Sequence, residues 1–332
     1  MGRYLAQRLI GAVPTLVGVS VLTFLFIRLI PGDAITARLG TSTALTPEEL
    51  ASLRAYFGLD QPLLVQFWTW LSSLLHGNAG YSIRTGRPVF VEIAERLPAT
   101  LELAITAAII GLCVGIPVGV YTALKRSSWV SRAMLTTSLV GVSLPNFLIG
   151  IFLILIFAVW LGWLPSFGRG DTVQIGPWST GFLTTSGLKA LILPSITLGF
   201  FPMTLIMRLV RAEMLEVLRT DYIKFARARG LSDRAVNFGH ALKNTLVPVI
   251  TITGLQLGGI IAFAIITETV FQWPGMGLLF VQAVQFADIP VMVAYLCLIG
   301  LIFVVINLVV DLLYYFVDPR LRFERTSAAG AH

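Results

Sequence analysis

The sequence has 332 residues, of which 56% are hydrophobic and only 12% are charged, and its formal net charge is +7. A soluble protein carries about a quarter charged residues, so this composition excludes an ordinary soluble domain and indicates a membrane protein with several spans. The two cysteines, Cys113 and Cys297, lie inside apolar runs, and the three histidines are far apart. Neither set has the spacing of a disulfide framework or a metal site, so no metal ligand is predicted.

Six apolar segments are long enough to cross a bilayer as helices. The first, residues 9–30, is too long for the core of a typical signal peptide and has no cleavage site after it, so we interpret it as an uncleaved span. The other predicted spans are residues 99–124, 133–161, 188–207, 246–267 and 291–315. Because backbone polar groups in lipid must bond internally, the predicted class is an all-α polytopic membrane protein.

The distribution of Lys and Arg predicts the orientation of these spans. With the N-terminus inside, the cytoplasmic segments hold 16 of the 24 basic residues. Loops rich in Lys and Arg stay in the cytoplasm, so both termini are predicted to be cytoplasmic. Topology thus accounts for the basic charge, and we expect the lipid bilayer and no nucleic acid as a partner.

Four regions follow from this topology. Residues 1–30 form a cytoplasmic segment and the first span, and residues 31–95 form an outer loop with short helices. Residues 96–316 form the main helical domain, which contains a cytoplasmic loop at 212–245, and residues 317–332 form a cytoplasmic tail.

The outer loops contain three local signals. Residues 46–49 (TPEE) form a capping box with proline at the first helical position, which predicts a short helix. Residues 63–77 (LLVQFWTWLSSLLHG) fit equally a helix on the outer membrane surface and a helical cap packed on the spans. Trp273, Pro274 and Gly275 predict a tight turn that, with Gly277, leads into a re-entrant or surface helix.

Small residues and prolines mark the predicted spans. Stripes that let helices approach closely are formed by Gly111, Gly115 and Gly119, and by Gly254 and Gly258. Such a stripe packs either within the chain or against a partner subunit. Kinks are expected at Pro117, Pro145 and Pro202.

The sequence lacks the residues of an energy-coupling or catalytic site. None of the four lysines follows a glycine, so there is no Walker A motif. Ion-coupled carriers place ionisable groups near the bilayer midplane. The ionisable residues of these spans instead lie toward span ends: Glu102, Lys189, Glu268 and Asp311. No catalytic residue is predicted, and the chain is interpreted as a transport pathway that is driven from elsewhere.

The charged segment 221–244, DYIKFARARGLSDRAVNFGHALKN, interrupts the apolar pattern. Asp221 is predicted to cap a helix over residues 222–229, and Gly230 to supply the left-handed residue that ends it. Ser232 is predicted to cap a second helix from Asp233 to about Asn244. Two interpretations fit this pattern: a solvated loop that holds the inside charges, and a docking helix for a cytosolic partner.

Residues 226–251, ARARGLSDRAVNFGHALKNTLVPVIT, resemble the cytoplasmic signature loop of ABC importer permeases, whose short helix docks on the ATPase subunit. The chain is similar over almost its whole length to the B-type permease subunit of the dipeptide/oligopeptide (peptide/nickel) importers. The segments that carry this likeness are LIPGD (29–33), YFGLDQP (56–62), RLPATLELA (96–104), EMLEVLRTDYIKFARARGL (213–231) and TETVFQWPGMG (267–277). Lys224 stands in place of the glutamate of the generic Glu-Ala-Ala motif, and Lys243 replaces its later proline, which is displaced to Pro248.

The resemblance implies the type I ABC importer permease fold with six transmembrane helices. It implies a pore-forming subunit that moves di- or oligopeptides across the bacterial inner membrane by alternating access. The implied partners are a homologous second permease in a heterodimer, two cytosolic ATPase subunits that bind ATP and Mg²⁺, and a periplasmic or lipid-anchored substrate-binding protein. This chain itself is expected to bind no cofactor. Nickel or glutathione is the alternative cargo, and an ion-coupled secondary transporter is the alternative class.

The resemblance also implies a set of residues that bear on the ATPase. They are Tyr222, Lys224, Ala226, Arg227, Arg229, Gly230, Ser232, His240 and Asn244. In this set Gly230 is expected to provide the backbone conformation of the loop. Arg227 and Arg229 are expected to interact with charged groups of the partner.

Overall fold

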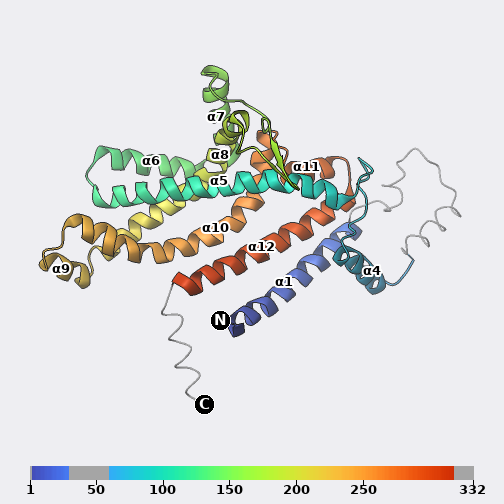
Figure 1. The fold of residues 1–332 in the computed structure, drawn as a ribbon, viewed down its shortest axis with the longest axis horizontal. Helices are drawn as coiled ribbons and strands as arrows, with labels where there is room; N and C mark the ends of the chain where they lie inside the picture. Colours follow the sequence, from blue (N-terminus) through green and yellow to red (C-terminus); the bar gives the residue numbers. More distant parts are fainter. Residues whose placement is uncertain (1, 30–59, 318–332) are drawn as a thin grey trace, which may run out of the picture. The chain divides into compact units, whose positions relative to one another are not determined.

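The computed structural model describes residues 2–29 and 60–317, which are mostly helical (Figure 1). They belong to two compact units: Met1–Leu97 with Leu278–Val304, and Pro98–Gly277 with Val305–His332. The predicted helix at residues 46–49, most of the LIPGD and YFGLDQP motifs and the predicted tail after residue 317 lie outside the described residues.

Each predicted span falls on helical structure. The helices are α1 (Gly2–Leu29), α5 (Val89–Leu124), α8 (Thr185–Val217), α10 (Leu242–Val270) and α12 (Ile289–Val317), and the third span corresponds to α6 (Trp129–Ser143) with α7 (Asn146–Leu153). A π-helical segment, η1 (Ile154–Trp160), continues α7. Among the described residues, three helices are long and apolar enough to cross a membrane alone, and two bent pairs could each form one further span.

The third predicted span is broken at Pro145, where a kink was predicted, and the break is much sharper than a kink. Residues Trp129–Ser143 and Asn146–Trp160 meet at an angle of 116°. Leu144 between them is extended, with φ −91° and ψ 137°. Pro145 causes this break, because a proline disfavours helical backbone at the preceding residue and has no N–H to continue the ladder. By contrast, α5 and α8 continue through Pro117 and Pro202.

The first unit combines α1, α4 (Leu63–Leu75) and the early part of α12. The ring of Phe24 in α1 packs edge-on against Phe67 of α4, with centroids 5.4 Å apart, and lies 5.8 Å from the ring of Trp70. Leu64 and Trp68 on α4 are exposed. The structure therefore shows residues 63–75 as a helix that packs on α1 and keeps an exposed apolar face.

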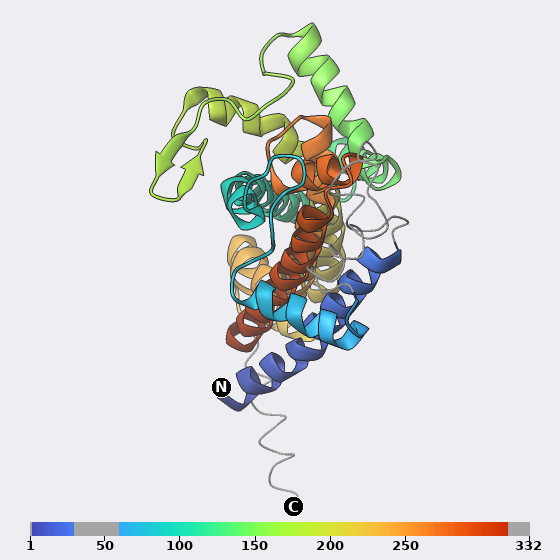
Figure 2. The ribbon, with the colours of Figure 1, turned by 90° about the vertical axis from the view of Figure 1, so that its right-hand side faces the viewer.

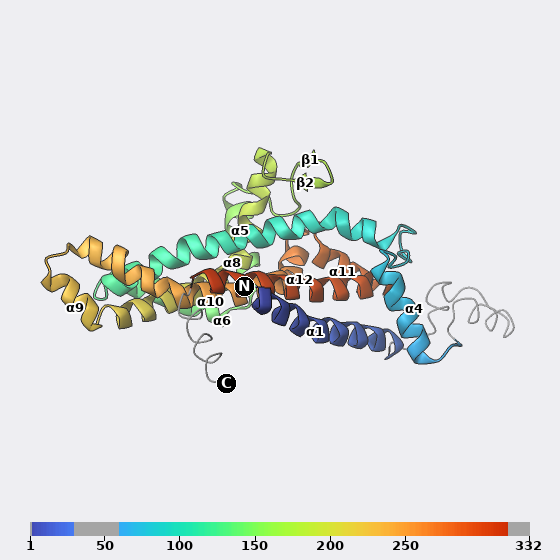
Figure 3. The same ribbon diagram turned by 60° about the horizontal axis from the view of Figure 1, so that its bottom comes forward.

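In the second unit, α8 lies among α5, α6, α7 and α10 (Figures 1 and 3). A Cβ at Gly115 would lie 2.9 Å from the Met203 carbonyl of α8, and one at Gly119 would lie 2.7 Å from the Met207 carbonyl. Gly111 lies farther from α8, 3.7 Å from the Met203 nitrogen by the same measure. This stripe thus lets α5 approach the backbone of α8.

The second predicted stripe lies on α10, which bends by 46° between Pro248–Gly254 and Gly258–Val270. A Cβ at Gly254 would collide with the side chain of Val310 on α12. Gly258, which starts the second arm of the bend, is buried. Gly254 therefore sits where α10 and α12 approach each other within the second unit.

A short hairpin is present that the sequence analysis did not predict. Strands β1 (Val173–Ile175) and β2 (Trp178–Thr180) pair antiparallel, with Gln174 opposite Ser179 (Figure 2). Gly176 begins the two-residue turn with a φ of +59°, a conformation that glycine adopts without steric cost. The Gly-Pro pair between apolar residues was the available signal for this turn.

Candidate functional site

Helix α9, Asp221–Ala228, forms the first half of the charged segment. The N-cap residue is Thr220, which makes no side-chain cap bond, so the prediction that Asp221 is the cap is wrong by one residue. Asp221 lies in the first turn, where a carboxylate favours the helix dipole, and pairs with Lys224 at 2.8 Å on the exposed surface.

Gly230 ends α9 with a left-handed backbone, at a φ of +79°. The Gly230 nitrogen donates to the Arg227 carbonyl at 2.9 Å, and the Leu231 nitrogen donates to the Ala226 carbonyl at 3.3 Å. These two bonds form a Schellman motif, which satisfies the last carbonyls of a helix. A Cβ at Gly230 would meet nothing within 4 Å. Glycine is therefore favoured here by the left-handed backbone conformation and not by lack of space.

The second half of the segment joins the following span without a break. The hydroxyl of Ser232 accepts from the Ala235 nitrogen at 3.4 Å, as expected of an N-cap. The helix then runs through the π-helical η2 (Ala235–Ala241) directly into α10, so the prediction that it ends near Asn244 is wrong. The Asn244 amide donates to the Tyr222 hydroxyl at 2.7 Å and ties α10 to α9.

One face of α9 is part of the core of the second unit. Ile223 is fully buried and Ala226 is 8% exposed. They belong to one hydrophobic cluster with residues of α5, α8, η2 and α10: Val120, Ala123, Ile206, Val210, Met214, Val236, Ala241 and Val249. Through Ile223 and Ala226, α9 therefore packs in one close-packed cluster with α5, α8, η2 and α10.

The opposite face of α9 and its surroundings are exposed and both aromatic and basic. The side chains of Phe225 and Phe238 are 63% and 53% exposed, and the guanidinium of Arg229 lies 5.8 Å from the Phe225 ring centroid. We call the exposed residues Tyr222, Phe225, Arg227, Arg229, Leu231 and Phe238 of this segment the α9 surface.

The α9 surface differs in part from the predicted set. Ala226 belongs to the buried face, whereas Lys224, Ser232 and His240 are exposed. The exposed apolar residues Phe225, Leu231 and Phe238 were not in the predicted set, because the prediction followed charge. A signal for Phe225 was available in the sequence. Helical periodicity places it on the opposite side of a helix from Ile223 and Ala226, and an exposed aromatic ring is unusual in a solvated loop.

Trp273 lies in the turn after α10, at the opposite end of that helix from α9. Its indole nitrogen donates to the Ala99 carbonyl of α5 at 2.9 Å, and its backbone nitrogen donates to the Glu268 carbonyl at 2.8 Å. A Cβ at Gly275 would collide with the Glu268 carboxylate, and one at Gly277 would lie 2.6 Å from Cα of Ile265. After Pro274 the chain enters α11 (Met276–Gln285), the short helix expected there.

Two buried carboxylates complete this corner. Thr100 donates to Glu268 at 2.6 Å and accepts from the Met276 nitrogen at 2.8 Å. Arg169 donates to Glu102 at 2.6 Å, and both side chains are almost fully buried. The Arg169 guanidinium also lies 5.9 Å from the Trp273 ring. We call these five residues, Thr100, Glu102, Arg169, Glu268 and Trp273, the carboxylate corner.

The carboxylate corner joins α5, α10 and the hairpin loop through buried polar contacts. Glu102 accepts from the Gly181 nitrogen at 3.3 Å in addition to the ion pair with Arg169. Its hydrogen bonds are of the kind that makes a buried charge tolerable. Among the residues that the structure describes, no three His, Cys, Asp or Glu side chains gather as ligands for a metal. The sequence analysis placed Glu102 and Glu268 near span ends but did not single out Arg169.

The long apolar helices, with an exposed aromatic and basic surface at one end and a buried polar joint at the other, define a multi-span helical membrane protein. Residues 115–323 match the family model of the binding-protein-dependent transport system inner membrane component, and residues 1–104 match the model of the N-terminal part of such components. The chain belongs to this family of membrane components of binding-protein-dependent transport systems.

Its curated relatives are permeases. The dipeptide transport system permease protein DppB of Alkalihalophilus pseudofirmus is 40% identical over 96% of this chain and 99% of the relative. The di/tripeptide permease DppB of Pseudomonas aeruginosa is 41% identical over 97% of this chain and 99% of the relative. The glutathione transport system permease protein GsiC of Shigella flexneri is 40% identical over 98% and 100%.

Solved structures of the MetNI methionine ABC transporter in inward-facing conformations resemble the fold. One aligns with a TM-score of 0.53 at 18% identity, covering 66% of this chain and 93% of that chain. A second crystal form gives a TM-score of 0.50 at 19% identity with the same coverage. The chain thus has the type I ABC importer permease fold.

Proposed function

We propose that this chain is the pore-forming permease subunit of an ATP-driven ABC importer that moves short peptides across the bacterial inner membrane. The observation that carries the proposal is α9, which is built into the core through Ile223 and leaves an aromatic and basic surface exposed. Full-length relatives named as dipeptide and di/tripeptide permeases support the cargo class.

A second cargo, glutathione, is supported by the GsiC relatives at 40% identity. Glutathione is itself a short peptide, so both candidates lie in one chemical class. We assign discrimination between them to a substrate-binding protein that delivers cargo to the outer face. Competition of labelled dipeptide uptake by unlabelled glutathione distinguishes the two cargoes.

The proposed mechanism is alternating access driven by a pair of cytosolic ATPase subunits, which bind ATP and Mg²⁺. A groove on the ATPase receives the α9 surface of this chain, and a homologous permease presents its own docking helix to the second ATPase subunit. Closure of the ATPases on ATP displaces α9. Because Ile223 and Ala226 pack with Val210 and Met214, the displacement reaches α8 and the helices that contact it.

The proposed orientation places α9 in the cytoplasm and the carboxylate corner on the outer side. The exposed residues Lys224, Arg227 and Arg229 then lie inside, as the positive-inside rule requires. The two sites lie at opposite ends of α10, which has 29 residues and so a length of about 44 Å. This separation suits a protein that receives energy on one side of a membrane and substrate on the other.

Replacement of Gly230 by valine tests the docking role of α9. Valine is strained at residue 230 because the backbone there is left-handed, which β-branched residues rarely adopt. The valine side chain would not clash with a neighbour, because nothing lies within 4 Å of a Cβ at this position. We expect ATP-dependent peptide uptake and stimulated ATP hydrolysis to fall together at least tenfold, while membrane insertion is retained.

Two matched variants complete the test. Gly230→Asn should keep most activity, because asparagine tolerates a positive φ better than valine does. Gly239→Val places the same side chain at another open glycine of this segment, where no positive φ is required, and should be milder than Gly230→Val. Normal uptake by Gly230→Val would contradict the docking role.

A further inference from the structure

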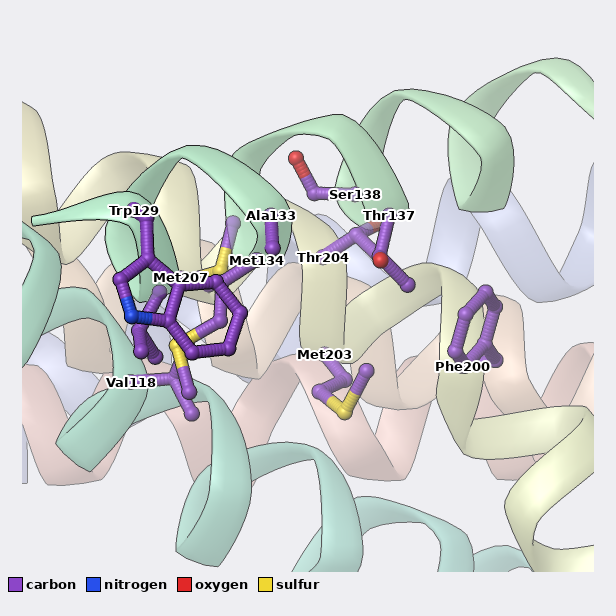
Figure 4. A pocket seen from close by; sticks show the side chains of 11 residues that line it. Val118, Trp129, Ala133, Met134, Thr137, Ser138, Phe200, Met203, Thr204 and Met207 are labelled. Carbon is purple, nitrogen blue, oxygen red and sulfur yellow. The ribbon is translucent and has the colours of Figure 1, made fainter.

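A groove opens between α6 and α8 in the second unit, with Val118 of α5 at its base (Figure 4). Its volume is about 250 Å³. The residues that line it are Val118, Trp129, Val130, Ala133, Met134, Thr137, Ser138, Phe200, Met203, Thr204 and Met207. Sites that enclose a whole drug-sized ligand have about 300–1,000 Å³, so this groove suits a segment of an elongated molecule.

The walls of the groove are apolar and adaptable. Met134, Met203 and Met207 supply flexible thioether side chains. The hydroxyl of Ser138 donates to the Leu135 carbonyl at 2.7 Å, and that of Thr204 donates to the Phe201 carbonyl at 2.7 Å. These two hydroxyls use their hydrogens within their own helices, so the groove favours a hydrocarbon occupant.

The groove has two different ends. Near Phe200 it closes, because α6 and α8 approach so closely that a Cβ at Gly141 would lie 2.6 Å from the Phe200 ring. At the other end stands Trp129, whose side chain is 77% exposed. Figure 4 shows Trp129 and Phe200 at opposite ends with Met203 between them.

The Trp129 end is surrounded by positive charge. Lys125 and Arg126 lie in the turn before α6, Arg132 lies one turn into α6, and all three are exposed. The sequence contains no Asp or Glu between Glu102 and Asp171, so no acid within this stretch offsets these charges. Tryptophan and basic residues at the end of an apolar surface are typical of the headgroup region of a bilayer.

We propose that this groove binds one anionic phospholipid of the cytoplasmic leaflet. An acyl chain lies along the methionine-lined groove, and the phosphate lies between Trp129 and the basic turn. An amphiphile is the occupant that matches an apolar channel with a cationic end. A hydrophobic helix of a partner subunit would fill the groove but would make no use of the three exposed cations beside it.

The test uses the complete transporter in nanodiscs with either phosphatidylcholine alone or an added fraction of phosphatidylglycerol. After extraction into mild detergent, native mass spectrometry counts the lipids that remain bound and identifies their headgroups. The charge variant combines Lys125→Gln, Arg126→Gln and Arg132→Gln, and its matched control combines Arg219→Gln, Arg234→Gln and Lys243→Gln. Size-exclusion chromatography verifies that each complex is assembled.

We expect the wild type to retain phosphatidylglycerol preferentially. The charge variant should lower this retention at least about tenfold, since each basic residue near an anionic headgroup contributes about fivefold. The matched control should retain phosphatidylglycerol like the wild type. Equal headgroup preference in the charge variant and the wild type would overturn the proposal.

A second pair of variants tests the groove itself and does not alter charge. Ala133 lines the groove, whereas Thr136 is exposed on α6 outside it. Ala133→Phe should displace the retained lipid whatever its headgroup, and Thr136→Phe should not. Identical retention in these two variants, or absence of any retained lipid in the wild-type complex because a partner subunit covers the groove, would contradict the assignment.

Discussion

Arg169 and Glu102 show what a single ion pair does in this fold. The pair joins the hairpin loop to α5 at 2.6 Å, with side-chain exposures of only 7% and 2%. A buried ion pair adds little net stability over an apolar pair of the same volume. Removal of one partner is different, because the remaining charge is then buried without compensation.

We expect Arg169→Gln to lower the free energy of unfolding by about 3–5 kcal/mol, because it leaves the Glu102 carboxylate buried and unpaired. Equilibrium unfolding of the purified chain in detergent micelles measures the change. The matched control is Arg87→Gln, which breaks the exposed pair of Arg87 with Glu95. An exposed pair contributes less than about 1 kcal/mol, so equal losses in the two variants would contradict the role of the carboxylate corner.

At the scale of single residues, the sequence predicted the backbone conformation of Gly230 but not the contacts of Arg169 or the exposure of Phe225. Gly230 was predicted to be left-handed from its place after a short amphipathic helix, and its φ of +79° confirms that local expectation. Arg169 could not be paired with Glu102 from the sequence, because their contact crosses 67 residues. Phe225 was passed over because the interpretation of this segment followed its charges and not the two faces of the helix.

Helix α9 has one buried face and one exposed face, and the proposed docking role would use the exposed one. Ile223 is fully buried in the core cluster, and Phe225, two residues later, is 63% exposed. Helical periodicity places these residues on different sides of the element. Stability and partner binding are therefore separable by substitutions in neighbouring positions.

We expect Phe225→Ala to change the stability of the chain by less than about 0.5 kcal/mol, because its ring is mostly exposed. The same change should weaken association with the ATPase subunits by about 2 kcal/mol or more, roughly 30-fold, as for an aromatic anchor at an interface. Titration of purified ATPase against the nanodisc-embedded permease measures the affinity.

The matched variant is Ile223→Ala, which removes a buried side chain from the core cluster. It should lower stability by about 2–5 kcal/mol, and any loss of ATPase binding should follow from that loss of structure. Unchanged ATPase affinity in Phe225→Ala would show that the α9 surface is not the docking site.

Hydropathy predicted where the long helices lie in the sequence, but it did not predict how they bend. Apolar length located the predicted spans on helices, and five of the six match helices or bent pairs that could cross a membrane; the first corresponds to a shorter apolar helix, Ile10–Leu25, within α1. The 116° break at Pro145 was expected only as a kink, since how far a proline bends a helix depends on the packing around it. The hairpin was missed because its strands have only three residues each.

At the scale of the whole molecule, the proposed function requires an energy source outside this chain. Glu102 and Glu268, fully buried near the same end of the bundle, are bonded to Arg169 and Thr100. They are engaged in a structural joint and are not placed along α10 as an ion relay. This distribution favours an ATP-driven subunit over an ion-coupled carrier.

The most direct test of this account measures labelled dipeptide uptake by the complete transporter in proteoliposomes, with and without ATP, and with ionophores that dissipate ion gradients. ATP is supplied on the side of the ATPase subunits, and the binding protein on the opposite side. We predict that uptake requires ATP and persists when the gradients are dissipated. Uptake that continues without ATP or ATPase subunits but collapses with the ion gradient would contradict the account.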